Sequence, residues 1–210
     1  MIPINKITGR LGNQMFQFAA LYAYSRHFHV DYYFQNEQWF KKYEREIREM
    51  YGTGIEPNDY VSIHVRRGDY LIQPNSDLYI DLCATDYYER AISLFPDSKF
   101  MVFSDDLDWC RQKWGDDSRF AFSIGRDEVA DLNYMAGCQG HIIANSSFSW
   151  WAAWLGGGPI VAPREWFQDG IERCWCPKHW FRISVQGYHP SKWQKLLARF
   201  RHGLRVLFKR

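Results

Sequence analysis

Short apolar segments alternate with predicted helices along most of the chain. Four segments have the length and composition of buried β-strands: residues 60–65, 99–103, 141–144 and 159–162. Between them the pattern predicts four helices: residues 86–95, 107–114, 128–138 and 147–155. Strands that alternate with helices in this way predict an α/β fold with a parallel, doubly wound sheet.

The first sixty residues have a shorter and less regular pattern. Residues 2–7 predict a strand, 9–14 a glycine turn and 15–26 a helix, which together open a further α/β unit. An exposed helix is predicted over residues 41–48. Glycines at 52 and 54 then mark a boundary. We therefore divide the chain into three parts: a reduced N-terminal α/β half (1–57), a Rossmann-like domain (58–190) and a tail (191–210).

The tail has a one-sided pattern. Its apolar residues repeat at helical spacing: Trp193, Leu196, Leu197, Phe200, Leu204 and Leu207. The same segment holds seven Lys or Arg residues and no acid. Such a basic amphipathic helix is typical of proteins that lie on an anionic membrane surface. A terminal helix docked on its own domain is the alternative.

The charge of the remaining chain excludes one class of partner. The net charge is +2, but without the tail 19 basic residues face 24 acidic ones, a balance of about −5. Nucleic acid is therefore not an expected partner. No apolar region resembles a signal peptide or a spanning helix. These patterns predict a cytoplasmic protein, held peripherally at the inner membrane face by its tail.

Cysteines and aromatic residues add little chemistry by themselves. The five cysteines form no disulfide or zinc framework, so reduced thiols are expected: Cys83, Cys110, Cys138, Cys174 and Cys176. Aromatic residues make up 18% of the chain, with ten Trp. Proteins that bind sugars use such rings, but aromatic rings also fill ordinary cores.

The strand at 60–65 ends in a cluster of charged residues. His64, Arg66, Arg67 and Asp69 follow one another within six positions. Two adjacent guanidiniums at the end of a buried strand are costly unless an anion binds there, and their planar forks match phosphate oxygens. The pattern therefore predicts a diphosphate site. His64 shares a strand face with Arg66 and is expected to line that site.

Polar residues also follow two other predicted strands. Residues 145–149 open a helix, where hydroxyls and free N–H groups either bind an anion or simply cap the helix. Asp105 and Asp106 could bind a metal, cap the next helix or accept hydrogen bonds from a base. No third carboxylate lies at ligand spacing, so no metal is expected. The glycine turn at 9–14 is neither a dinucleotide fingerprint nor a P-loop.

Four motifs in this order resemble the α-1,2-fucosyltransferases of bacteria and animals. They are GRLGNQMFQFA at 9–19, VSIHVRRGDY at 61–70, FSDD at 103–106 and NSSFSWWAAWL at 145–155. The resemblance implies a GT-B-like fold with two domains. It also implies inverting transfer of L-fucose from GDP-β-L-fucose to a galactoside hydroxyl, in an α-1,2 linkage, without a cofactor or a required metal.

The resemblance also implies which residues contact the substrates. His64, Arg66 and Arg67 would hold the diphosphate, the serine-rich loop would contact phosphate or guanine, and Asp131 would contact guanine. The full set of expected substrate-binding residues is His64, Arg67, Asn13, Gln14, Asp105, Asp131, Ser146, Ser147, Phe148 and Ser149. Arg66 is expected to stabilise the departing diphosphate, since charge grows there in an oxocarbenium-like transition state. Asp69 is either the base for the acceptor hydroxyl or a structural partner of Arg67.

The chain departs from this family in the length of its N-terminal half. About fifty residues separate the GNQ turn from the HVRRGDY motif. Two functions are therefore kept. The first is a fucosyltransferase that acts on a cell-surface glycan, and a lipid-linked acceptor at the membrane would fit the basic tail. The second is a non-catalytic GDP-sugar-binding or assembly protein. A transferase for another GDP-sugar is a third, and completion by a second copy in a homo-oligomer is left open.

Overall fold

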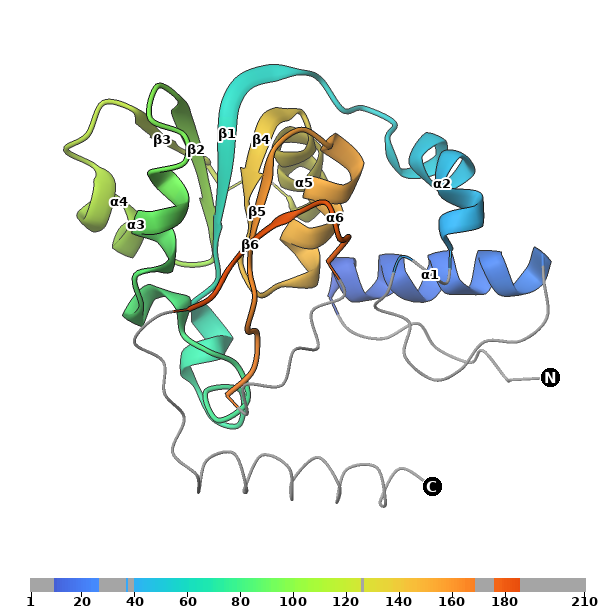
Figure 1. Ribbon diagram of the computed structural model, residues 1–210, viewed down its shortest axis with the longest axis horizontal. Coiled ribbons are helices and arrows are strands. Elements are labelled where there is room, and N and C mark those ends of the chain that lie inside the picture. Colours follow the sequence, from blue (N-terminus) through green and yellow to red (C-terminus); the bar gives the residue numbers. More distant parts are fainter. Residues whose placement is uncertain (1–9, 27–36, 38–39, 126, 169–175, 186–210) are drawn as a thin grey trace.

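The computed structural model describes residues 10–26, 37, 40–125, 127–168 and 176–185. The predicted strand at 2–7 and the tail at 191–210 lie outside the described residues. Within them, the chain forms a mixed α/β structure in which helices cover a central sheet (Figure 1).

The six described strands form one parallel sheet. They are β1 (Asn58–Val65), β2 (Lys99–Ser104), β3 (Phe120–Phe122), β4 (Cys138–Ile142), β5 (Ile160–Pro163) and β6 (Phe181–Ile183). Their order is β3-β2-β1-β4-β5-β6, with every neighbouring pair parallel. The prediction of a doubly wound parallel sheet is confirmed. β3 and β6 were not predicted, because three residues are too few to show a periodic pattern.

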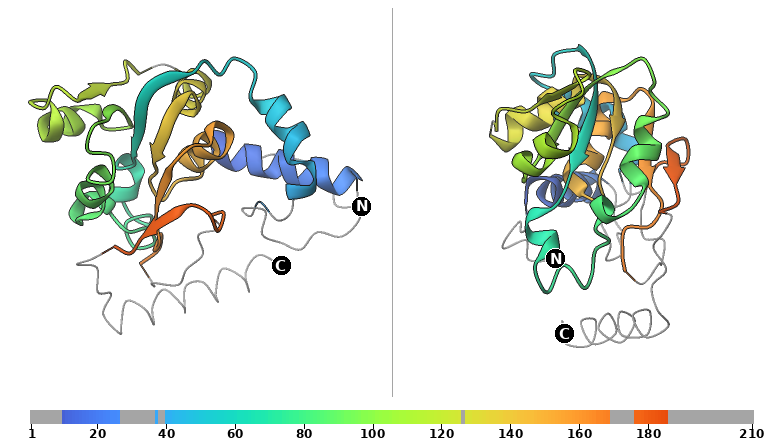
Figure 2. Two further views of the ribbon diagram at one scale, coloured as in Figure 1. Left: turned by 45° about the horizontal axis from the view of Figure 1, so that its top comes forward. Right: turned by 90° about the vertical axis from the view of Figure 1, so that its left-hand side faces the viewer.

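The described residues form six α-helices: α1 (Leu11–Arg26), α2 (Glu44–Tyr51), α3 (Tyr87–Ile92), α4 (Leu107–Trp114), α5 (Glu128–Ala136) and α6 (Ser147–Gly156). α3 and α4 lie on one side of the sheet and α5 and α6 on the other, while α1 and α2 project beyond α6 (Figures 1 and 2). The two faces of the sheet bury separate hydrophobic clusters.

Several predicted boundaries are wrong. Residues 11–14 form the first turn of α1 rather than a loop, because Gly12 packs inside the structure instead of turning the chain. β4 runs from Cys138 to Ile142 rather than over 141–144. α5 ends two residues earlier than predicted, at Ala136, and Gly137 then allows the chain to enter the sheet at once. A Cβ at Gly137 would overlap the backbone oxygen of Glu56.

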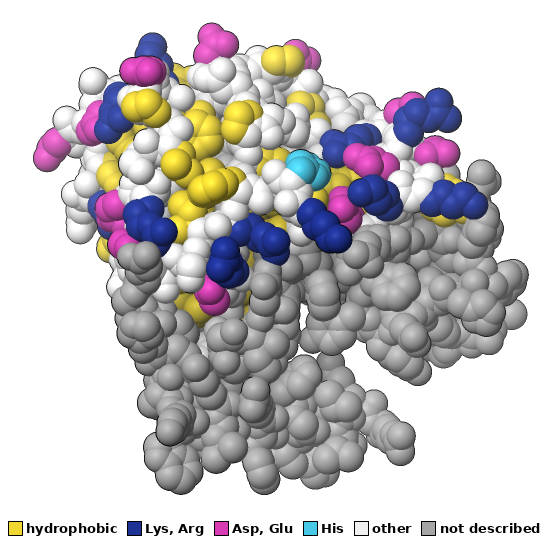
Figure 3. Space-filling view, in the orientation of Figure 1, with side chains coloured by type: hydrophobic (Ala, Val, Ile, Leu, Met, Phe, Trp, Pro, Cys, Tyr) yellow, Lys and Arg dark blue, Asp and Glu magenta, His cyan; other side chains and the backbone are white. Residues whose placement is uncertain are grey.

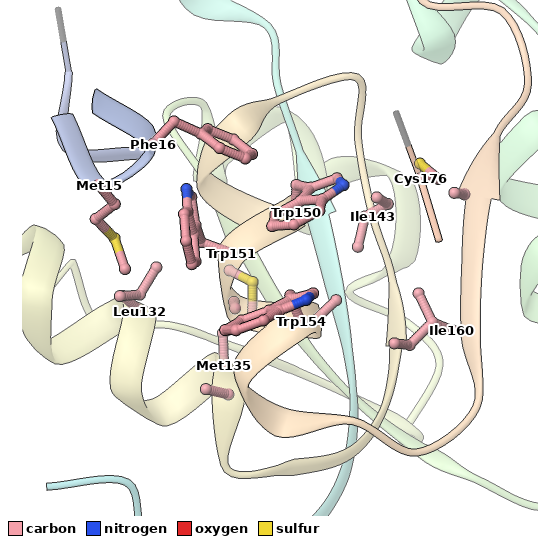
Figure 4. Close-up of a cluster of buried hydrophobic side chains, with 14 of the residues drawn as sticks. Met15, Phe16, Leu132, Met135, Ile143, Trp150, Trp151, Trp154, Ile160 and Cys176 are labelled. Atoms are coloured by element: carbon pink, nitrogen blue, oxygen red, sulfur yellow. The ribbon is translucent and has the colours of Figure 1, made fainter. Parts of the chain in front are cut away.

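Tryptophans of α6 fill the core between α6, α1 and α5. Trp150, Trp151 and Trp154 are all nearly inaccessible to solvent. Phe16 of α1 lies 4.7 Å and 4.8 Å from the rings of Trp150 and Trp151, and Figure 4 shows these side chains together. These aromatic residues therefore stabilise the fold and are not available to bind a sugar.

The N-terminus of α1 is held against the N-terminus of α6 by a close backbone approach. A Cβ at Gly12 would lie 2.7 Å from the backbone nitrogen of Phe148 and the carbonyl carbon of Ser147. Only glycine allows this distance without moving a helix. The approach places the start of the N-terminal half beside the carboxyl ends of the strands.

The prediction of reduced thiols is wrong for Cys176. Cys176 is disulfide-bonded, whereas Cys83, Cys110 and Cys138 are free. Sequence spacing does not show which thiols meet in the fold, so the prediction failed there.

A search of the described residues for a helix able to cross a bilayer, by length and hydropathy, finds none.

Candidate active site

A cleft of about 370 Å³ opens at the carboxyl edge of the sheet. The ends of β1 and β2 form its floor, and the first turns of α1, α5 and α6 surround it. Doubly wound sheets place ligands at this edge, because parallel strands deliver their following loops to the same side. The cleft brings together most of the predicted site residues: Asn13, His64, Arg66, Asp69, Asp105, Asp131, Ser146, Ser147 and Phe148.

Arg66 is the central cation of the cleft. Its side chain is 11% exposed and forms ion pairs with Asp105, at 2.9 Å from Nη1 to Oδ2, and with Asp69. The ring of Tyr70 lies 5.3 Å from the guanidinium carbon. A guanidinium that is held on several sides keeps one orientation and still presents charge to a ligand.

Arg67 points away from the cleft. Its Nε donates to Oδ2 of Asp106 at 3.0 Å, and its guanidinium carbon lies 4.3 Å from the ring of Trp109 in α4. Asp106 also caps α4 by accepting from the backbone N–H of Trp109. In this structure the two arginines therefore do not both face the cleft, and contact of Arg67 with substrate stays a prediction.

His64 lies buried in the wall of the cleft. Burial, and then the positive charge of Arg66, lowers its pKa to about 3, so the ring is neutral near pH 7. The ring lies 5.5 Å from that of Phe148. Its Nδ1 has no hydrogen-bond partner among the residues that the structure describes. A neutral imidazole can donate to a ligand oxygen without adding a charge.

The N-terminus of α6 opens into the cleft. Ser146 is the N-cap residue, and its hydroxyl accepts from the backbone N–H of Phe148. The hydroxyl of Ser147 donates to Oδ1 of Asn13 at 2.9 Å, which links α6 to α1. Capping and anion binding were both kept open for this loop. Ser146 caps the helix and also lines the cleft, so the positive end of the helix dipole faces the site.

Two carboxylates predicted from the sequence line the cleft. Asp69 pairs with Arg66 and lies 3.8 Å from Arg10, so the alternative that Arg67 is its structural partner is wrong. The turn that begins at Gly68 directs it toward the cleft instead. Asp131 also lines the cleft and accepts from the hydroxyl of Ser123 at 2.8 Å. In the described part of the chain, no group of three or more His, Cys, Asp or Glu side chains could hold a metal ion.

Two further predicted residues lie outside the cleft lining. Gln14 is exposed on α1, and Ser149 is buried with its hydroxyl donating to the backbone oxygen of Ser146. Their roles in substrate binding stay predictions. Sequence reasoning also missed several lining residues: Arg10, Tyr70, Asn75, Tyr79, Phe103, Ser104 and Glu128. Four of them stand within the quoted motifs and could have been found there: Arg10, Tyr70, Phe103 and Ser104.

Asn75 and Tyr79 enter the cleft only through tertiary structure. The ring of Tyr79 stacks on that of Tyr70 at 4.1 Å, and the hydroxyl of Tyr70 donates to the backbone oxygen of Asn145. The buried amide of Asn145 donates in turn to the backbone oxygen of Ile80. These contacts hold the loop after β1 against the start of α6, which no local pattern reveals.

The model of glycosyl transferase family 11 matches residues 30–182. The chain belongs to this family. Over 180 residues it is 34% identical to the alpha-1,2-colitosyltransferase of Escherichia coli, in a match that covers 72% of this chain and 61% of that protein. It is 30% identical to galactoside 2-alpha-L-fucosyltransferase SEC1 of Bos taurus, over 55% of this chain and 33% of that protein. This family 11 chain therefore spans less than two thirds of these relatives.

A solved structure supports the fold. The Escherichia coli heptosyltransferase WaaC with ADP superposes with a TM-score of 0.50 and 10% identity, over 95% of this chain and 58% of that one. At this identity the similarity concerns architecture alone. It agrees with a GT-B-like arrangement for the family 11 chain, whose division at residues 57 and 190 stays a prediction.

Proposed function

We propose that the chain is an inverting glycosyltransferase that transfers L-fucose from GDP-β-L-fucose to a galactoside hydroxyl, in an α-1,2 linkage. Membership of family 11 supports the reaction class. The observation that carries the proposal is Arg66, a nearly buried cation beside the N-terminus of α6 at the carboxyl edge of the sheet. These are the groups that a departing diphosphate requires.

The mechanism follows from where charge develops. The bond from the sugar to the diphosphate breaks through an oxocarbenium-like transition state, so negative charge grows on the phosphate oxygen. Arg66 and the backbone N–H groups at the start of α6 would stabilise that charge. Neutral His64 would add a hydrogen bond at no electrostatic cost. In this proposal the protein's own cations and dipoles supply the stabilisation, without a metal.

Asp131 and Asp69 would contact different parts of the substrates. Asp131, fixed by Ser123, could accept hydrogen bonds from the N–H groups of a guanine base. Asp69, paired with Arg66, would lie near the sugar and the acceptor. An acceptor hydroxyl would have to approach an oxygen that Arg66 or Arg10 already contacts, so Asp69 acts as a base only if that contact loosens when substrate binds.

Two other functions have support. A relative is named a colitosyltransferase, which favours GDP-colitose as an alternative donor. The short N-terminal half favours a protein that binds the GDP-sugar without transferring it. Purified protein, supplied with GDP-fucose or GDP-colitose and a panel of galactosyl acceptors, separates these functions. GDP binding without any transfer would support the non-catalytic function.

Replacement of Arg66 tests the assignment. Arg66→Ala should lower the transfer rate by about a hundredfold or more, or about 3 kcal/mol in activation free energy, as for a lost oxyanion donor. The control is Arg111→Ala, which removes a surface arginine paired with Asp108. Steady-state transfer measured with radiolabelled donor decides, and a rate near that of the wild type for Arg66→Ala contradicts the assignment.

A further inference from the structure

Asp105 contacts three consecutive residues of the loop after β1. Its Oδ2 lies 2.9 Å from Nη1 of Arg66, and its Oδ1 accepts from the backbone N–H of Arg67 at 3.0 Å. A Cβ at Gly68 would overlap Oδ2, so only glycine lets the carboxylate lie so close. One side chain from the end of β2 thus fixes the backbone and the guanidinium of its neighbouring strand.

The other carboxylate on Arg66 cannot do the same. Asp69 belongs to the short helical turn that follows Arg66 and moves with the same loop. Asp105 comes from a different part of the sheet, because it directly follows Ser104, the last residue of β2. It is also less exposed, at 24% against 40% for Asp69. The position of the guanidinium relative to the sheet therefore depends on Asp105.

Each oxygen of Asp105 already has a protein partner, Oδ2 in Arg66 and Oδ1 in the Arg67 backbone. The cleft is also acidic. Its charged lining residues are two arginines, Arg10 and Arg66, and four carboxylates, Asp69, Asp105, Glu128 and Asp131. An anionic donor must therefore share Arg66 with carboxylates that repel its phosphates.

We propose that Asp105 is a positioning residue that acts through Arg66, rather than the substrate-binding residue that the sequence suggested. It holds the guanidinium where charge develops on the departing phosphate, and its own charge weakens binding of the phosphates. This inference rests on the proposed function of the cleft. It predicts that affinity and rate change in opposite directions when the charge of Asp105 is removed, which a merely structural role would not produce.

Asp105→Asn is the decisive variant, because it keeps the side chain's size and the acceptor for the Arg67 backbone. We expect it to bind GDP about three- to tenfold more tightly, since one repelling charge is gone. We expect kcat for fucose transfer to fall about tenfold or more, since the guanidinium loses its fixed position. Asp108→Asn is the matched control, because Asp108 is 91% exposed and its replacement changes the net charge equally.

The pair with Arg66 is tested by a double-mutant cycle. In an Arg66→Lys background, which lacks the planar fork, Asp105→Asn should change kcat by about twofold or less. If the double variant instead loses kcat by the product of the two single-variant factors, Asp105 acts independently of Arg66, which would overturn the proposal. Thermal unfolding of each variant, followed by circular dichroism, shows whether a loss of activity comes from unfolding or from the substitution itself.

Isothermal titration with GDP separates this proposal from the proposed function. If the wild type transfers no fucose, the function fails, but the binding measurement still decides the role of Asp105. Weaker GDP binding by folded Asp105→Asn than by the wild type would overturn the proposal in either case. So would a kcat within twofold of the wild type where transfer occurs.

Discussion

Adjacent residues at the end of β1 have different surroundings because their side chains point in opposite directions. Arg66 faces the cleft, whereas Arg67 packs on Trp109 and pairs with Asp106 on the other side of the loop. One strand face therefore supplies both His64 and Arg66 to the cleft. Charge density in the sequence indicated an anion site, but only the direction of each side chain shows that Arg66 lines the cleft and that Arg67 packs against α4.

Two buried histidines should make stability depend on pH. Burial lowers the pKa of His64 to about 3 and that of His141 to about 4. The unfolded chain therefore binds more protons than the folded one below pH 6.5, the ordinary value. The unfolding free energy should fall by roughly 1.4 kcal/mol per histidine for each pH unit from 6.5 down to about 5.

Urea unfolding at pH 7 and pH 5 measures this effect. The variant His141→Gln should lose about half of the dependence, and replacement of exposed His179 should leave it unchanged. Equal unfolding free energies at the two pH values in the wild type would contradict the assignment of the two histidines as buried and neutral.

At the scale of elements, α6 connects the two halves of the chain. Its N-terminus meets α1 at Gly12, and its tryptophans pack on Phe16. Its C-terminus meets α2, where Nη1 of Arg48 donates to the backbone oxygens of Trp154 and Leu155. A cation at this end complements the helix dipole and satisfies carbonyls that have no partner within the helix.

Arg48→Ala should therefore loosen α2 from α6. The variant loses hydrogen bonds to two carbonyls and the contact of the guanidinium with the Trp154 ring, at 4.0 Å. We expect a loss of about 1–3 kcal/mol in unfolding free energy. The control, Arg45→Ala, changes an exposed arginine of the same helix. Denaturant midpoints measure both, and equal values for the two variants would contradict the docking role.

At the scale of the whole molecule, the described strands form one parallel sheet, and the described residues before β1 contribute α1 and α2. The surface shown in Figure 3 intersperses basic and acidic side chains rather than separating them. Membrane association at the inner membrane face through the tail at 191–210 remains a prediction from the sequence.

Removal of the tail tests the membrane proposal. A chain ending at Pro190 should lose most of its partitioning onto vesicles that contain anionic phospholipid, because seven basic residues and an apolar helix face are removed. High salt should weaken binding of the full chain. Equal co-sedimentation of the two chains with the vesicles would show that the tail is not the anchor.

The sequence by itself determined the α/β class, the strands β1, β2 and β5 to within two residues at each end, and the edge of the sheet that carries the site. Alternating apolar runs and polar strand ends are local signals, and they suffice for these features. Four motifs also indicated the family. The short strands β3 and β6 lack such a signal, because their positions depend on neighbours already in the sheet.

Only the tertiary structure decided how the site is assembled. The direction of Arg67, the entry of Asn75 and Tyr79 into the cleft, and the hold of Asp105 on Arg66 all depend on contacts between distant segments. A sequence shows which groups follow each strand, but it does not show which partner each group meets. Those partners determine whether a charged residue binds a ligand or positions another residue that does.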